Sequence, residues 1–240
     1  MKKKFFIIIF IFSLLLVMLG GCATFEKADL SGLRVVAVVS VVADRKIDMS
    51  DFKGLGAMVS KLSQSKDFKL DDVVNQIRND VFEEYAPYLP FELMKERDVL
   101  NNEIYRNFYN EMGIDAKRLS YTTPKGYQII LMNKKNHAKL FEAFPEAGGL
   151  MYLRADYKLS KTKGGLLGGE AKVLSRYHIT VVDRTGKKVL ERTNWAVSDG
   201  IIKFAFGGIM DAKQIMPLVI MSSAKAAETT KNWIQREMGE

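Results

Sequence analysis

The sequence predicts a single α/β (α+β) domain in a three-layer-like arrangement, with a mixed sheet, a C-terminal antiparallel meander and a long C-terminal helix. Three observations predict this class. Residues 35–42 form a nearly unbroken run of β-branched side chains, which is typical of a strand buried on both faces. Apolar and polar side chains alternate between residues 151 and 181, as in strands with one buried face. Residues 216–238 carry apolar side chains at helical spacing.

The first part of the domain reads as a strand followed by a helix. After the strand at 35–42, residues 45–68 fit no single element, because two glycines interrupt any long helix there. Apolar side chains at helical spacing then predict a helix over 70–85. Pro87 and Pro90 end this helix, since proline cannot continue a helical hydrogen-bond pattern.

Four shorter elements are expected before the meander. The patterns predict a strand, a helix, a possible strand and a short helix, over residues 91–95, 99–112, 127–132 and 137–144 respectively.

The meander begins after a pair of glycines at residues 148 and 149. Two alternating strands are predicted over 151–159 and 173–181, followed by a turn at 183–186 in which Gly186 supplies the positive φ. A further strand runs through Trp195. The terminal helix follows, and Pro217 fits only its first turn. Its apolar stripe consists of Met216, Ile220, Ala224, Ala227, Ile234 and Met238.

Composition limits the classes of function. The chain has 240 residues, of which 48% are hydrophobic, so it can form a packed core and is not disordered. One cysteine excludes an intramolecular disulfide and any site of several thiolates, and two histidines leave little for a histidine-rich zinc centre. We therefore expect no cofactor and no bound metal.

The lone cysteine ends an apolar leader. Lysines occupy positions 2–4, and residues 5–19 are apolar apart from one serine. The leader closes with a motif that resembles the lipobox of bacterial lipoprotein signal peptides, Leu19-Gly20-Gly21-Cys22. This resemblance implies cleavage between Gly21 and Cys22, lipidation of the Cys22 thiol, and a lipid bilayer as partner.

Two other interpretations of the leader stay open, an uncleaved transmembrane anchor and an ordinary signal peptide. This stretch of fifteen residues, one of them a serine, is short of the roughly 20 apolar residues that cross a bilayer. We expect a signal peptide at 1–21, a lipidated tether at 22–33 and one α/β domain at 34–240. Ala23 after the lipidated residue implies sorting to the outer membrane, facing the periplasm, in bacteria with two membranes.

Charge gives little support to a nucleic-acid partner. The formal net charge of the whole chain is +8 at pH 7. The leader holds three lysines and no acidic residue, so the net charge without it falls to +5. We expect no nucleic-acid partner, because an exported chain with this charge lacks a nucleic-acid footprint.

The order of the predicted elements is similar to that of the curli-secretion-channel lipoproteins and the related penicillin-binding-protein activator lipoproteins. Three stretches carry the resemblance. Residues 91–100 resemble a strand that ends in Glu-Arg and opens a helix at a leucine. Residues 138–157 resemble a short helix that runs through small residues into the first meander strand. Residues 179–190 resemble a hairpin that turns at Thr-Gly. One departure is that residues 39–42 continue apolar where the family often has Asp-Phe.

The resemblance implies an accessory role in the cell envelope. We expect a membrane-anchored, non-catalytic interaction or assembly factor, whose partners are other envelope proteins or copies of itself. An oligomeric secretion-channel-like subunit is one alternative, but each hairpin that spans a membrane needs two strands of about 9–11 residues. Residues 200–208 offer only one short apolar run. A carrier of a small apolar ligand is the other alternative, for which the twelve methionines would suit a pliable pocket.

Two apolar segments are candidates for contact with a partner or a lipid surface. The first lies at the expected tip of the long hairpin, where a flexible glycine-rich loop is the simpler interpretation. The second follows the meander, where packing against the terminal helix is the simpler interpretation. The candidate residues are Leu166, Leu167, Ile201, Ile202, Phe204 and Phe206.

No residue pattern indicates catalysis, and we expect no enzyme activity. His178 should lie on the polar face of its strand, and His137, near a helix start, can be solvated. Neither accompanies a nucleophile motif. Glu96 and Arg97 are expected to pair with each other at a strand end. Three carboxylates with intervening cations fit a solvated acidic loop better than a calcium loop, namely Asp44, Asp48 and Asp51.

Overall fold

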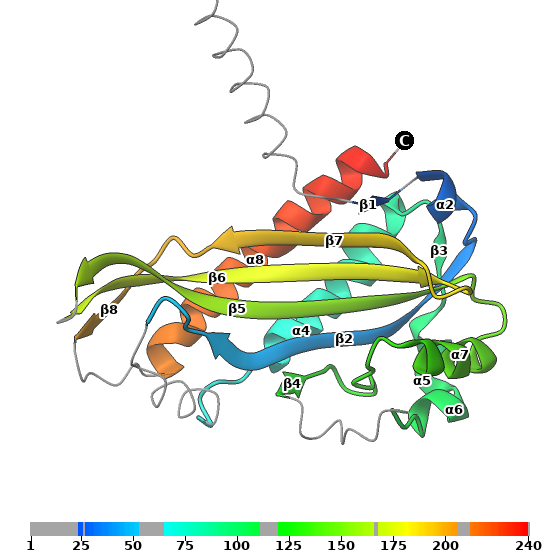
Figure 1. Cartoon of the computed structure of the whole chain (residues 1–240), viewed down its shortest axis with the longest axis horizontal. Coiled ribbons are helices and arrows are strands. Elements are labelled where there is room, and N and C mark those ends of the chain that lie inside the picture. Colours follow the sequence, from blue (N-terminus) through cyan, green and yellow to red (C-terminus); the bar gives the residue numbers. More distant parts are fainter. Residues whose placement is uncertain are drawn as a thin grey trace, which may run out of the picture.

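The structure is a computed structural model of the chain and describes residues 24–25, 27–52, 65–110, 120–165, 168–205 and 212–239. Across these residues the strands form one eight-stranded mixed sheet with helices on both faces, which confirms the α/β class (Figure 1). The strand order is β1-β7-β6-β5-β2-β3, with β4 paired to β2 and β8 paired to β6. The strands are β1 (Thr24–Phe25), β2 (Val35–Asp48), β3 (Glu92–Leu93), β4 (Tyr121–Thr122), β5 (Gly149–Gly165), β6 (Gly168–Asp183), β7 (Lys188–Val197) and β8 (Ile202–Ala205).

The helices divide between the two faces of the sheet (Figure 1). The long C-terminal helix and the helix that follows β2 pack behind the sheet, and three short helices lie at one end of the opposite face. The helices are α2 (Lys27–Ser31), α4 (Asp71–Asn79), α5 (Glu96–Asn101), α6 (Glu103–Arg106), α7 (Lys134–Ala143) and α8 (Ala212–Glu237). The π-helix η1 (Asp80–Tyr85) and the 3₁₀ turn η2 (Ala86–Tyr88) continue α4.

The meander strands β5, β6 and β7 place alternate side chains on opposite faces, as their sequences predict. Met151, Leu153 and Tyr157 of β5 are buried against α4 and α8. Leu150 and Tyr152 face the other way and form a second core with the short helices. The strand β5 extends well beyond those helices, so none of the described helices lies over one end of this second face (Figure 1).

The strand β2 is central and buried on both faces, as its apolar run predicts, but it continues to Asp48. It runs parallel to β5 on one side and to β3 on the other. Side chains bind its carbonyl groups where β3 ends. The Tyr105 hydroxyl donates to the Val39 carbonyl at 2.9 Å, and the Thr123 hydroxyl donates to the Val41 carbonyl at 2.8 Å.

Two predictions in the middle of the chain were wrong. The helix expected over 99–112 is divided at Asn102, whose side chain accepts a hydrogen bond from the Tyr105 amide and so begins α6. Residues 127–132 form no strand. The Gln128 amide donates to the Tyr105 hydroxyl and the Leu131 amide donates to Asn110, so side chains replace the expected strand partner.

The expected tether at 22–33 is already folded at Thr24. The strand β1 pairs with β7, and Leu30 of α2 is completely buried. The Lys187 ammonium also lies 2.7 Å from the Asp29 carboxylate. The tether prediction was wrong for residues 29–33, because Leu30 and Leu33 are buried in the core. Gly21, Cys22 and Ala23 lie outside the described residues.

The helix α8 begins earlier than expected, and it faces the core with only part of the predicted stripe: Ala227, Ile234 and Met238 are buried as expected. Ala212 and Ile215 are buried, so Pro217 lies inside the helix and not in its first turn. Ile220 is 48% exposed, and Ala224 is also exposed, although both belong to the predicted core stripe. Among the residues that the structure describes, no helix is both long enough and apolar enough to cross a membrane.

Candidate functional site

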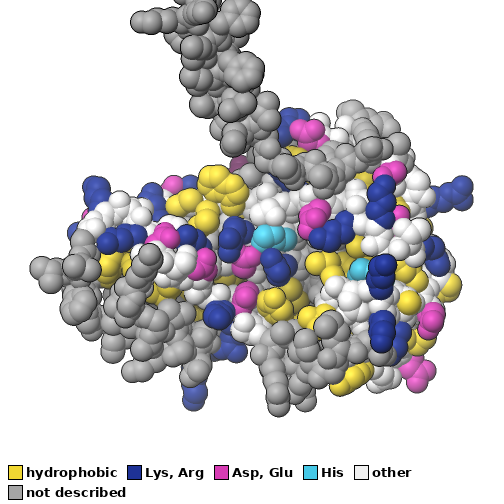
Figure 2. Space-filling model, viewed as in Figure 1, with side chains coloured by type: hydrophobic (Ala, Val, Ile, Leu, Met, Phe, Trp, Pro, Cys, Tyr) yellow, Lys and Arg dark blue, Asp and Glu magenta, His cyan; other side chains and the backbone are white. Residues whose placement is uncertain are grey.

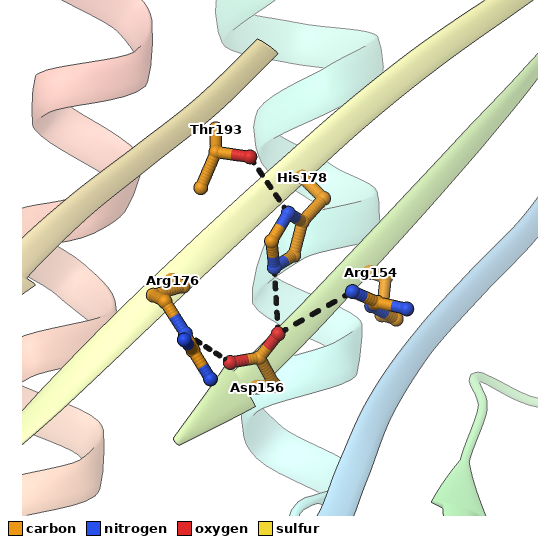
Figure 3. Close-up of polar contacts among 5 residues, drawn as sticks. All are labelled: Arg154, Asp156, Arg176, His178 and Thr193. Atoms are coloured by element: carbon orange, nitrogen blue, oxygen red, sulfur yellow. Dashed lines mark hydrogen bonds and ion pairs between the residues drawn. The ribbon is translucent and has the colours of Figure 1, made fainter. Parts of the chain in front are cut away.

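A cluster of charged side chains lies on the uncovered part of the sheet. Asp156 of β5 contacts three cationic or ionisable groups: Arg176 and His178 of β6, and Arg154 of its own strand (Figure 3). His178 Nε2 lies 2.6 Å from Asp156 Oδ2, and its Nδ1 lies 2.8 Å from the Thr193 hydroxyl of β7. Strand alternation produces this cluster, because residues paired across neighbouring antiparallel strands point to the same face.

The carboxylate of Asp156 lies beneath the cations. Its side chain is 14% exposed, whereas those of Arg154 and Arg176 are 46% and 36% exposed. Burial alone would raise the pKa of Asp156, but hydrogen bonds and charge from His178 and Arg176 outweigh burial, so the pKa is lowered. The cluster therefore presents the N–H groups of two guanidinium ions to solvent above one neutralising carboxylate. Such groups bind carboxylates or phosphates in a bidentate way.

An exposed tryptophan adjoins the cluster. Trp195 of β7 pairs in register with Arg176, so its indole lies on the same face, and it is 62% exposed. We call Arg154, Asp156, Arg176, His178 and Trp195 the polar sheet face. Figure 2 shows this side of the molecule, with basic and acidic side chains interspersed around a histidine near its middle.

A shallow groove borders the polar sheet face where β2 bulges away from β5. The pairing of the two strands shifts between Ala43 and Ile47. The groove has a volume of about 370 Å³, and charged side chains of both signs line it. These side chains are Asp44, Lys46, Asp48, Arg154, Asp156 and Arg176. The balance of charges indicates a surface for polar contacts.

Thr193, His178 and Asp156 are joined by hydrogen bonds in the order hydroxyl, imidazole, carboxylate, as in the catalytic triad of a hydrolase. Such a triad also needs donors aimed at the developing oxyanion. The strand β6 has β5 on one side and β7 on the other, so its backbone N–H groups around His178 bind neighbouring strands. The oxygen atoms of Asp156 are shared between His178 and the arginines. The three side chains therefore form part of one hydrogen-bonded charge cluster with the two arginines.

The three carboxylates expected in an acidic loop have separate partners. Asp44 accepts hydrogen bonds from the Lys46 amide and the Ser120 hydroxyl, and Asp48 accepts one from the Ser50 amide. Asp51 pairs with Lys158 at 2.7 Å. Within the described part of the chain, no group of three or more His, Cys, Asp or Glu side chains could hold a metal ion.

Two other expectations about polar residues were wrong. His137 is buried, its ring lies 5.7 Å from that of Tyr152, and burial lowers its pKa. It is therefore part of the second core. Glu96 pairs with Arg78 of α4, which lies 18 residues away in sequence, and Arg97 pairs with Asp98. The predicted local pair of Glu96 with Arg97 is absent, because Arg78 reaches Glu96 through the fold.

The structure divides the six candidate contact residues. Leu166, Leu167 and Phe206 lie outside the described residues. The strands on either side of the first two form a hairpin up to the pair Gly165 and Gly168. Ile202 is buried, so its assignment to a contact surface was wrong. Phe204 packs edge-on against Phe52 with ring centroids 5.1 Å apart, and Ile201 is exposed.

Comparison with known proteins adds little. No protein-family model matches the sequence, and no curated protein matches it. Among solved structures, the hypothetical protein CT253 from Chlamydia trachomatis matches with a TM-score of 0.30 and 8% sequence identity. The match covers 85% of this chain and 98% of that chain. A likeness this weak supports no conclusion about family or function.

Of the polar sheet face, the sequence singled out only His178. It did not predict that Arg154, Asp156, Arg176 and Trp195 lie beside it. The sequence does show charged residues alternating with apolar ones along parts of β5 and β6. When the two strands pair, Arg154 lies opposite His178 and Asp156 lies opposite Arg176, so all four side chains are on one face. Register was needed to bring them together, because Asp156 and His178 are 22 residues apart.

Proposed function

We propose that this protein is a non-catalytic interaction or assembly factor of the bacterial cell envelope, anchored to a membrane through lipidated Cys22. We further propose that it contacts another envelope protein through the polar sheet face. The partner surface would carry an acidic group and an apolar patch, complementary to the two arginines and to Trp195.

One observation carries this proposal: Trp195 is 62% exposed directly opposite Arg176 on a part of the sheet without a covering helix. Tryptophan and arginine are the residue types most enriched at the energetic centres of protein interfaces. A large aromatic ring left in water also costs hydrophobic free energy that a partner would recover. The neighbouring guanidinium groups supply the directional contacts that orient a partner.

The folded N-terminal segment supports a close approach to the membrane. Cys22 comes two residues before Thr24, which pairs with Glu191 of β7. Two residues span at most about 7 Å. A lipidated Cys22 would therefore hold the β7 side of the domain near the bilayer surface, most simply the periplasmic face of the outer membrane. A partner embedded in or bound to that membrane would then meet the polar sheet face.

Photo-crosslinking in bacterial cells tests the contact. A photoreactive benzoylphenylalanine at position 195 should give a discrete crosslinked species, and the same residue at position 229 should not. Thr229 is an exposed residue of α8 and serves as the matched control. Adding Arg154→Glu and Arg176→Glu should reduce the position-195 product at least about tenfold, because the charges facing an acidic partner are reversed. Equal products with and without the arginines would contradict the proposal.

Lipid labelling tests the anchor separately. Cells supplied with an alkyne-modified palmitate should label the wild-type chain, and Cys22→Ser should lose both the label and the recovery of the chain in membranes. Retention of label by the Cys22→Ser variant would contradict lipidation at this cysteine. Loss of label with unchanged membrane recovery would indicate that another feature holds the protein at the membrane.

A further inference from the structure

The opposite face of the domain contains a pocket between the two helices behind the sheet. It has a volume of about 460 Å³, which is within the usual range of small-molecule sites. Its wall is mainly apolar and is formed by α4, the π-helix η1, α8 and one side chain of β6. The apolar and aromatic lining residues are Val73, Tyr85, Tyr177, Ile220, Ala224 and Ala227.

One carboxylate in this pocket is buried and only half satisfied. Asp80 lines the pocket, and only 6% of its surface is exposed. Its Oδ1 accepts a hydrogen bond of 2.7 Å from the side-chain amide Nε2 of Gln76. Its Oδ2 is buried without a hydrogen-bond partner among the described residues. A buried carboxylate oxygen without a donor is costly, and a cation bound beside Asp80 in the pocket would offset part of that cost.

The charges around the pocket favour a cationic ligand. Besides Asp80, the wall includes the carboxylates of Asp72, Glu84 and Glu228 and a single ammonium group, that of Lys231. This ammonium already pairs with Glu84. The pocket is therefore acidic at its polar positions and apolar elsewhere. A volume of 460 Å³ holds only about one turn of an α-helix, which makes a small molecule a better fit than a peptide helix.

We propose that the pocket between α4 and α8 binds a small amphiphile, a protonated amine attached to an apolar body. The ammonium group pairs with the carboxylate of Asp80, and the apolar body lies along Ile220, Ala224 and Ala227. This activity is separate from the polar sheet face, which lies on the other side of the sheet, so each proposal can fail without the other.

The local backbone supports a dedicated site. Asp80 opens and Tyr85 closes the π-helix η1, whose wider turns interrupt the regular hydrogen-bond pattern. Single π-helical turns are rare and occur often at functional sites. At the end of this segment the Tyr85 hydroxyl donates to the Ala227 carbonyl of α8 at 3.1 Å. This bond ties the two helices together beside the pocket.

Calorimetric titration with two matched probes tests the proposal. The full chain, held in a neutral detergent, is titrated with 4-phenylbutylamine and with 4-phenylbutanol, and detergent alone provides the blank. The two probes have the same apolar body, but only the amine is charged at pH 7. We expect the amine to bind at least about tenfold more tightly than the alcohol, the effect of one charge-assisted hydrogen bond.

Four variants locate the binding, two at the pocket and two matched controls. Asp80→Asn should abolish the preference for the amine while leaving the affinity for the alcohol unchanged. Asp71→Asn makes the same charge change at an exposed position of α4 that does not line the pocket, and it should behave as wild type. Ala224→Phe should fill the pocket and weaken both probes at least about tenfold, whereas Thr229→Phe should not.

Several results would overturn the proposal. Equal affinity of the wild-type chain for the two probes would remove the role of Asp80. Failure of both probes to bind, or binding unaffected by Ala224→Phe, would remove the pocket as the site. Because Ala224 is exposed, its variant should keep the fold and provide a result even if Asp80→Asn unfolds the chain.

Discussion

Asp156 of β5 and Asp80 of η1 lie on opposite sides of the sheet. Their environments shift their pKa values in opposite directions. Burial is the largest influence on both and acts to raise the pKa. At Asp156 the contacts with His178 and Arg176 outweigh it, and the pKa is lowered. At Asp80 the main opposing contact is the uncharged Gln76 amide, and the pKa is raised.

Burial acts on both carboxylates in the same direction, so their opposite pKa directions follow from their contacts: cationic groups at Asp156 and an uncharged amide at Asp80. Asp156 is saturated by groups of its own chain, so the polar sheet face offers its arginines and Trp195 to the outside. One oxygen of Asp80 has no hydrogen-bond partner within the part of the chain that the structure describes, and Asp80 lines the pocket between α4 and α8. The two faces are therefore suited to different occupants, a protein and a small cation.

Of the substitutions that test this comparison, removal of the buried Trp233 should have the largest effect on the free energy of unfolding. Trp233 of α8 is buried in the core, and the Arg192 guanidinium lies 5.1 Å from its ring centroid. Trp233→Ala should lower the free energy of unfolding by about 3–5 kcal/mol, because it removes a large side chain from a packed core. Urea unfolding measures this loss, and a change below about 1 kcal/mol would contradict the packing of α8 on the sheet.

Asp156→Asn should lower the free energy of unfolding at pH 7 by about 1–2 kcal/mol. The loss is smaller than for a fully buried ion pair, because the arginines are partly exposed. The folded-state pKa of Asp156 is lowered, so its contribution is present above the unfolded pKa of about 3.9 and is lost as pH falls through the folded pKa. The difference between wild type and variant should therefore disappear in acid. A constant difference from pH 7 to pH 2 would show that charge is not the cause.

Asp80→Asn should raise the free energy of unfolding at pH 7 by about 1 kcal/mol, because the ionised carboxylate is buried without a cation in contact. The folded-state pKa is raised, so the contribution of Asp80 is present below the unfolded pKa and is lost as pH rises through the folded pKa. Wild type should thus gain stability relative to the variant as pH falls. Urea unfolding at several pH values tests this, with Asp71→Asn as control. A variant less stable than wild type at pH 7 would contradict it.

Trp195→Ala should change the free energy of unfolding by no more than about 0.5 kcal/mol, since the ring lies mostly in solvent. Its effect should appear in partner binding instead. A loss of 2 kcal/mol or more in urea unfolding would show that the indole supports the fold, and would weaken its assignment to an interface.

The alternating strands were predictable because successive side chains of a strand point to opposite faces, so apolar and polar residues alternate when one face is buried. The pairing of β6 with β7 follows from that alternation and from the turn at Gly186, which adopts a φ of +81°. Segments whose backbone partners are side chains were not predictable in this way. Residues 127–132 lack a strand because Tyr105 and Asn110 bind their amides, and neither contact leaves a periodic signal.

The pocket was missed because an apolar helical stripe does not distinguish a core from a cavity wall. Ile220 and Ala224 were assigned to the core, and both line the pocket. A usable signal was Asp80, which comes three residues after Ile77 and seven after Val73 and so falls on the apolar face of its helix. An acidic residue at such a position requires a partner from outside the helix.

The central claim, that the polar sheet face is a contact surface, is tested most directly by hydroxyl-radical footprinting of the two tryptophans. In the purified chain Trp195 should oxidise readily and Trp233 should resist, in line with their exposed fractions of 62% and 4%. In native membranes Trp195 should be protected, and Arg154→Glu with Arg176→Glu should remove that protection. Equal oxidation of Trp195 in the purified chain and in native membranes would contradict the account.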